Sequence, residues 1–152
     1  MYSNITDQLL NLRFELRTVA AGDTAFDNES WQKLKETCPL NGHCYIVALI
    51  VQELHGGKLV RGVFEDSSIS HYWNQLPSGI EVDLTGDQYG GDGFNPVING
   101  VVKDEVFPKP YDLTRLEIMK NRLSAWKSLD FQERFRLHLI KSAQEEYYDR
   151  QN

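Results

Sequence analysis

Residues 41–51 read NGHCYIVALIV, and this stretch decides the fold. Cys44 follows a flexible Gly-His step and precedes an unbroken apolar run, which continues to His55 and stops at the glycine pair 56–57. The length of the run favours a short helix, although several of its residues would also suit a strand. A helix that is apolar on almost every side is buried. We therefore expect the central helix of the domain here, with Asn41 as its N-cap and the glycine pair as its exit.

Cys44 falls in the first turn of this predicted helix. The backbone N–H groups of a first turn have no partner inside the helix, and the positive end of the helix dipole lies there, so both favour a thiolate. The thiolate is the nucleophilic form of cysteine. The position therefore suits a nucleophile, and it also suits a small apolar residue that is simply packed.

The composition of the chain limits the classes of protein to which it can belong. Its 152 residues suit one domain, residues 1–152, whose core needs no disulfide or metal. The net charge of −6 and the pI near 5.2 predict no broad phosphate-binding surface and no nucleic-acid partner. The sequence contains no recognisable signal segment or membrane-spanning run, and its two cysteines do not resemble a secreted disulfide scaffold. We therefore expect a cytoplasmic protein with no cofactor and no membrane contact.

Beyond the glycine pair, apolar residues no longer recur at the spacing of a helix but at every second position, which predicts strands. These strands cover residues 58–64, 68–76 and 79–85, and the turn residues 77–79 predict that the last two form a hairpin. If the hairpin is symmetric about Pro77, residue 75 faces 79, residue 73 faces 81, and His71 faces Asp83. Directly opposed residues on one face have Cβ atoms about 5 Å apart. This register makes His71 and Asp83 neighbours.

Helices are predicted on both sides of this core. Helical periodicity covers residues 6–20, and a helical tail runs over about 111–150, with capping-box patterns that begin at Thr114 and Asp130. The apolar stripes of these helices predict core packing. They consist of Leu9, Leu12, Leu16, Val19, Leu116, Met119, Leu123, Trp126, Phe135, Leu139 and Tyr147.

A helix-start cysteine and a histidine–aspartate pair suggest nucleophilic catalysis. Cys44 would attack, His71 would take the thiol proton, and Asp83 would orient the imidazole. This chain order resembles that of papain-like and transglutaminase-like enzymes, in which the cysteine helix packs on antiparallel strands that carry the other two residues. The Cys44 backbone N–H and a neighbouring donor, for which His43 or Asn74 is a candidate, would hold the oxyanion.

A zinc site is a second class of hypothesis. Its candidate ligands are Cys38, His43, Cys44 and His71. Adjacent histidine and cysteine residues are awkward ligands for one tetrahedral ion, and paired metal-ligand spacing is missing. We therefore predict no metal site.

A non-enzymatic binding module is a third class. Trp73, Tyr72 and Tyr89 would then form an aromatic patch, and Cys44 would be structural. The glycine-rich residues 86–110 read as a long loop, which is either an ordered lid near the site or an ordinary surface excursion.

The motifs of residues 31–89 resemble the YunG-like family of small bacterial and phage proteins. The similarity covers the helix-start cysteine and its apolar helix, a glycine pair, a His-Tyr-Trp-Asn strand, a Leu-Pro turn and an Asp-Leu-Thr segment. In this chain these pieces are residues 41–52, 56–57, 70–79 and 81–85, followed by Asp87-Gln88-Tyr89.

This resemblance implies that Cys44, His71 and Asp83 are the counterparts of the family's Cys, His and Asp. The chain departs from the family at His43, because the family more often has glutamine before the cysteine. Glutamine would donate to an oxyanion, and an imidazole can also donate. The candidate oxyanion and substrate-contacting residues are His43, Asn74, Trp73 and Gln88.

The sequence therefore predicts an α+β domain with a papain- or transglutaminase-like core at about residues 31–89, flanked by N- and C-terminal helices. The predicted chemistry is acyl transfer from an amide or related carbonyl through a Cys44 thioester. Hydrolysis, deamidation and transfer to an amine share that first step. The expected substrate is a protein, a peptide or a small amide.

Overall fold

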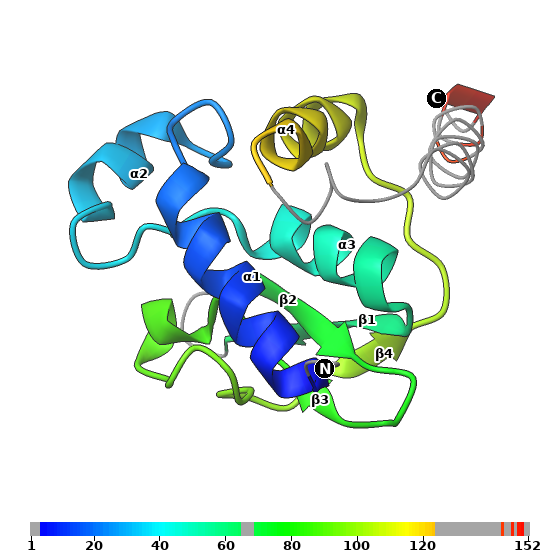
Figure 1. Cartoon of the computed structure of the whole chain (residues 1–152). Helices are drawn as coiled ribbons and strands as arrows, with labels where there is room; N and C mark the ends of the chain where they lie inside the picture. The colour runs from blue at the N-terminus through cyan, green and yellow to red at the C-terminus, as the bar shows by residue number, and fades with distance from the viewer. Residues whose placement is uncertain (1–3, 65–68, 124–143, 145–146, 148, 151–152) are drawn as a thin grey trace.

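The computed structural model describes residues 4–64, 69–123, 144, 147 and 149–150. It is an α+β structure, as the sequence predicts, with a four-stranded antiparallel sheet and helices packed on it (Figure 1). The elements are α1 (Ile5–Val19), α2 (Asn28–Leu34), α3 (Cys44–His55), β1 (Lys58–Val63), β2 (Ser70–Gln75), β3 (Glu81–Val82), the 3₁₀ helix η1 (Gly86–Tyr89), β4 (Val101–Lys103) and α4 (Pro110–Asn121).

Helix α3 is the central element of the fold, as its apolar sequence predicts. Residues 46–51 are all buried, and α3 lies against β1 and β2 with α4 on its other side (Figure 1). The core cluster continues into α1 through Leu9, Leu12 and Leu16. Burying apolar surface in such layers is the main source of stability for a domain of this kind. No described helix is both long and apolar enough to cross a membrane.

The two ends of α3 differ in how well the sequence predicts them. The predicted N-cap, Asn41, is wrong by two residues, because His43 is the N-cap and makes no side-chain capping bond. The C-terminal end of α3 is at the glycine pair, as the sequence predicts. Gly56 and Gly57 have φ values of 76° and 86°, and a Cβ on Gly57 would meet the Gln75 carbonyl oxygen at 2.1 Å. A side chain is therefore excluded where the chain turns back along β2.

The β2–β3 hairpin forms, but with a register that is shifted by two residues from the predicted one. Asn74 pairs with Val82 and Gln75 with Glu81, so the hairpin is symmetric about Ser78. The turn explains the shift. The Gly79 amide donates to the Leu76 carbonyl at 2.8 Å, which centres the hairpin one residue beyond the predicted centre at Pro77. A shift of two residues keeps every side chain on its predicted face.

Three other predictions about the elements need correction. Strand β3 has two residues, fewer than the predicted 79–85. The predicted loop 86–110 contains η1 and also β4, which pairs with the free edge of β1. Helix α4 begins at Pro110, close to the start predicted for the helical tail, but the predicted capping box at Thr114 is not where it begins. The Asp112 side chain accepts a hydrogen bond from the Lys109 amide at 3.0 Å and caps the helix earlier. The tail helix predicted from Asp130 lies almost entirely outside the described residues.

Candidate functional site

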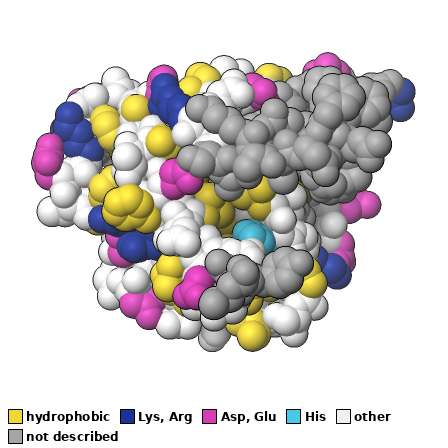
Figure 2. Space-filling model, in the orientation of Figure 1, with side chains coloured by type: hydrophobic (Ala, Val, Ile, Leu, Met, Phe, Trp, Pro, Cys, Tyr) yellow, Lys and Arg dark blue, Asp and Glu magenta, His cyan; other side chains and the backbone are white. Residues whose placement is uncertain are grey.

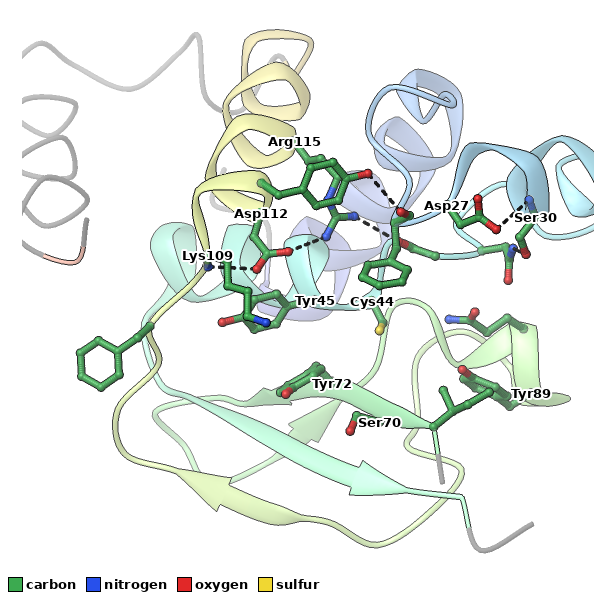
Figure 3. A pocket seen from close by; sticks show the side chains of 17 residues that line it. Asp27, Ser30, Cys44, Tyr45, Ser70, Tyr72, Tyr89, Lys109, Asp112 and Arg115 are labelled. Carbon is green, nitrogen blue, oxygen red and sulfur yellow. Dashed lines mark hydrogen bonds and ion pairs between the residues drawn. The ribbon is translucent and has the colours of Figure 1, made fainter. Parts of the chain in front are cut away.

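Cys44 is the first residue of α3, and its side chain lines a cavity of about 730 Å³. Figure 3 shows its sulfur pointing into this cavity, with Tyr45 and Tyr72 on one side and Tyr89 on the other. Because Cys44 opens the helix, its own N–H is among those without an intrahelical acceptor. The thiol and a free backbone donor therefore lie at the same point of the chain.

The loop before Cys44 is held in place by α4. The buried Arg115 guanidinium donates through Nη1 to the carbonyls of Thr24 and Gly42, at 3.1 and 3.3 Å, and through Nη2 to Asp112 at 2.9 Å (Figure 3). The Gly42 carbonyl also accepts from the Phe26 amide at 2.9 Å. A rigid lead-in of this kind fixes where the cysteine helix begins.

His71 of β2 and Asp83, which directly follows β3, form a fully buried pair. The His71 Nε2 donates to Asp83 Oδ2 at 2.6 Å, and each side chain is 1% exposed. The other carboxylate oxygen, Oδ1, accepts from the Thr85 amide at 3.1 Å and from its hydroxyl at 3.3 Å. Asp83 is therefore fixed on both oxygens, and it fixes the orientation of the imidazole.

The electrostatics of the site favour a charged imidazole. Burial lowers the pKa of His71, but the hydrogen bond to Asp83 and the adjacent Cys44 side chain outweigh burial and raise the pKa to about 9. The second ring nitrogen, Nδ1, is buried and has no hydrogen-bond partner among the described residues. The structure thus brings Cys44, His71 and Asp83 together, with Nδ1 as the nitrogen left for the thiol.

Aromatic rings cover the imidazole. The Tyr89 ring stands edge-on to His71 with its centroid at 4.8 Å, and Phe64 packs on Tyr89 at 4.2 Å. Burial, and then the charges of Cys44 and Asp83, raise the pKa of Tyr89 to about 12. The low-polarity cover reduces access of water to the pair and strengthens its electrostatic interactions.

His43, one of the predicted oxyanion donors, is not among the residues that line the cavity. Its Nδ1 donates to the Asn41 carbonyl at 2.9 Å, and its Nε2 accepts from the Thr24 hydroxyl at 2.7 Å. The residue is fully buried, and burial lowers its pKa to about 4, so the ring is neutral at pH 7. His43 therefore holds the cysteine loop against the segment that follows α1, and neither nitrogen is left to donate to a ligand.

Asn74 and Trp73 also have partners inside the protein. Asn74 Nδ2 donates to the Ala48 carbonyl at 2.8 Å, which ties β2 to α3. Trp73 Nε1 donates to Glu81 Oε1 at 2.6 Å and ties β2 to β3. Neither residue lines the cavity. Both side chains position the sheet that carries His71.

Gln88 differs from the other three candidates. It lines the cavity together with Cys44, and its Nε2 is buried without a hydrogen-bond partner in the described part of the chain. Its element, η1, is anchored to α1, because Asp87 Oδ2 pairs with Arg13 at 3.2 Å and with Arg17 at 2.6 Å. The arginines are one helical turn apart, but no sequence signal connects them to Asp87, which is at least 70 residues away.

The cavity has aromatic and charged walls that sequence reasoning largely missed. Besides Cys44 and Gln88, it is lined by Phe26, Asp27, Ser30, Asn41, Gly42, Tyr45, Ile69, Ser70, Tyr72, Tyr89, Phe107, Lys109, Tyr111, Asp112 and Arg115. They come from α2, α3, β2, η1 and α4 and from the segments that precede these elements, so that their proximity depends on the tertiary fold. Of the three aromatic residues predicted to form one patch, Tyr72 and Tyr89 line the cavity and Trp73 does not.

The described residues contain no group of three or more His, Cys, Asp or Glu side chains placed to hold a metal ion. In particular, both ring nitrogens of His43, a candidate zinc ligand, already have protein partners.

The chain was compared with protein families, curated proteins and solved structures. The family model described as YunG protein matches residues 8–127, which is most of the chain, and the chain belongs to this family. No curated protein matches the sequence. No solved structure matches the fold.

Proposed function

We propose that this YunG family protein is an enzyme that attacks an amide or related carbonyl through a thioester on Cys44. The observation that carries the proposal is the environment of His71. Its Nε2 is committed to Asp83 at 2.6 Å, while its buried Nδ1, beside Cys44, has no partner among the described residues. An unpartnered buried nitrogen costs free energy, and such sites cluster where chemistry is done.

The first step is transfer of the Cys44 thiol proton to Nδ1 of His71. A His71 pKa of about 9 makes the imidazolium the main form at neutral pH, and Asp83 stabilises that charge. The thiolate is stabilised by the imidazolium and by the N-terminus of α3. A thiolate–imidazolium pair is the activated form of a cysteine nucleophile.

The thiolate sulfur then bonds to the carbonyl carbon, and the π electron pair of the C=O bond moves to the oxygen. Collapse of this oxyanion breaks the bond to the leaving group, which takes the proton from His71 Nδ1 and departs. A thioester remains on Cys44. Water or an amine then attacks the thioester carbonyl, and His71 accepts the proton of the attacking group. The carbon–sulfur bond breaks, so that the acid or amide product departs and the Cys44 thiolate and the His71 imidazolium are restored.

The likeness to papain-like and transglutaminase-like enzymes belongs to this proposal. It rests on the order of elements, since α3 carries the cysteine, β2 the histidine and the end of β3 the aspartate. The packing of α3 on β1 and β2 supports it. The three outcomes of the thioester, hydrolysis, deamidation and transfer to an amine, remain alternatives within one reaction class.

The cavity supports a protein, peptide or small amide as substrate. A volume of about 730 Å³ accommodates several side chains or a drug-sized molecule. Its aromatic walls favour an apolar or aromatic group beside the reacting carbonyl. On the face drawn in Figure 2, basic and acidic side chains are interspersed. Mixed charges of this kind do not form the continuous basic patch that binds a polyanion such as a nucleic acid.

A non-catalytic binding module is the second candidate. The observation that favours it is the same aromatic lining, which would hold an apolar ligand without any bond to Cys44. The two functions differ in one measurable property, the reactivity of the thiol.

The test is alkylation by iodoacetamide between pH 5 and 9, with adducts at each cysteine followed by peptide mass mapping. Cys38 is a matched internal control, because both thiols are free and partly exposed. We expect Cys44 to be alkylated faster than Cys38, with the largest difference at the acid end of this range, because the imidazolium of His71 stabilises the thiolate. In His71→Ala the rate of Cys44 should fall toward the rate measured for Cys38. A Cys44 that stays inert until the protein unfolds would establish a packed thiol and the binding module.

A further inference from the structure

We propose that Gln88 donates the second hydrogen bond to the oxyanion, through Nε2, alongside the backbone N–H of Cys44. This inference rests on the proposed function and assigns it a further catalytic residue. It also places that residue on η1, an element that the sequence indicates only as part of a long loop.

The first support is the state of the Gln88 amide. Its Nε2 is buried and has no hydrogen-bond partner in the described chain, although the residue lines the same cavity as Cys44. A primary amide carries two N–H donors, and leaving both unpaired in a buried place is unfavourable. A ligand oxygen that arrives next to Cys44 would satisfy them.

The second support is that the other candidate donors already have hydrogen-bond partners inside the protein. His43 uses both ring nitrogens inside the protein, Asn74 donates to the Ala48 carbonyl, and Trp73 donates to Glu81. Each would have to break a buried hydrogen bond in order to reach a substrate, which is unfavourable. Gln88 breaks none.

The third support is the rigidity of η1. Asp87 is clamped by Arg13 and Arg17 of α1. Gly86 packs so closely on Asp83 that a Cβ there would be 3.0 Å from the Asp83 Oδ2. The donor and the Asp83–His71 pair are thus parts of one packed unit. Oxyanion stabilisation needs donors that are held in place before the charge develops.

In the reaction, the sulfur–carbon bond forms and the carbonyl π electrons move to oxygen. The resulting negative charge accepts one hydrogen bond from the Cys44 N–H and one from Gln88 Nε2. When the oxyanion collapses, the electron pair returns to the carbon–oxygen bond and the leaving group departs with the proton from His71. Gln88 takes no proton at any stage.

Two reagents separate this role from activation of the thiol. Iodoacetamide is attacked at a saturated carbon and forms no oxyanion. The activated ester p-nitrophenyl acetate is attacked at a carbonyl and passes through one. Loss of one oxyanion donor in known enzymes lowers the rate about 100-fold or more. We therefore expect Gln88→Ala to lower the rate of Cys44 acylation by about 100-fold while the alkylation rate stays within about twofold of the wild type.

Gln88→Glu is the second variant, since it keeps the shape and replaces the N–H donors with a carboxylate. It should acylate at least as slowly as Gln88→Ala. Gln32→Ala, an exposed glutamine of α2 whose amide donates to Asn28, is the matched control and should leave both rates unchanged. Circular dichroism and thermal unfolding of each variant verify the fold.

Equal losses in both reactions would overturn the assignment, because Gln88 would then act on the thiol or on the fold. Unchanged acylation in Gln88→Ala and Gln88→Glu would also overturn it. These failures differ from a failure of the proposed function, in which wild-type Cys44 itself reacts with neither reagent until the protein unfolds.

Discussion

His71 and Asp83 are offset by two residues from direct opposition in the β2–β3 hairpin, yet Nε2 of one lies 2.6 Å from Oδ2 of the other. The contact is diagonal and joins side chains on the same face of the sheet. Trp73 and Glu81 repeat this diagonal at 2.6 Å, one step further along the hairpin. The β3 ladder ends at Val82, so the His71–Asp83 contact joins the two chain segments just beyond the last backbone pair of the hairpin.

The raised pKa of His71 predicts how stability depends on pH. The folded pKa is about 9, and the unfolded value is near 6.5, so the folded state binds a proton more tightly. This stabilisation is fully present below pH 6.5 and is lost as the pH rises through 9. Urea unfolding of the wild type at pH 6, 7.5 and 9.5 should show it. Asp83→Asn should flatten the decline, and an equal decline in both proteins would contradict the assignment.

Arg115 is predicted to stabilise both the fold and the cysteine loop. Arg115→Ala leaves the Asp112 carboxylate and two buried carbonyls without their donor. Loss of one partner of a buried charged pair costs about 3–5 kcal/mol. We expect a decrease of that size in the free energy of unfolding, measured with urea, and slower alkylation of Cys44 in the folded protein. Cys44 reactivity that is the same as in the wild type would show that the loop does not need Arg115.

The clamp on Asp87 is predicted to affect chemistry more than stability. Arg17 is 30% exposed, and ion pairs of that kind contribute about 0–1 kcal/mol. Arg17→Ala should therefore change the unfolding free energy little, but it should slow acylation of Cys44 by p-nitrophenyl acetate, because η1 loses a fixed anchor. Lys33→Ala removes a more exposed pair with Glu29 and is the control. Equal acylation rates in the two variants would contradict this prediction.

Two glycines with positive φ separate conformational strain from steric exclusion. Gly79 has a φ of 92°, and a Cβ added there would have no heavy atom within 4 Å, so Gly79→Ala should cost about 1–2 kcal/mol of stability. At Gly57, with a φ of 86°, the Cβ would also meet the Gln75 carbonyl oxygen at 2.1 Å. Gly57→Ala should therefore be clearly more destabilising, as chemical denaturation would measure. Similar losses at the two positions would show that the chain shifts freely near Gly57.

Local patterns were sufficient to predict the central part of the fold. The apolar run after Cys44 and the glycine pair at 56–57 define α3, because a fully apolar helix must be buried. The alternation after Gly57 predicts β1 and β2. The face shared by His71 and Asp83 survives the register error, since strand sides alternate with a period of two.

The rest of the site depends on contacts across the chain that leave no local signal. Arg115 reaches the Thr24 carbonyl from 91 residues away, and Arg13 reaches Asp87 from 74 residues away. Strand β4 has three residues, too few for a periodic pattern, and forms because β1 has a free edge. The start of α4 depends on Asp112, whose side chain caps the helix ahead of the capping-box pattern that begins at Thr114.

The anchoring of the cysteine loop by Arg115 and of η1 by Arg13 and Arg17 bears on how this protein could be divided. The motif region, residues 31–89, contains Cys44, His71, Asp83 and Gln88, but the arginines that hold it belong to α1 and α4. Transplanting that region into another scaffold would therefore transfer the reactive groups without their supports. The smallest unit that could be exchanged intact between family members extends from α1 through α4.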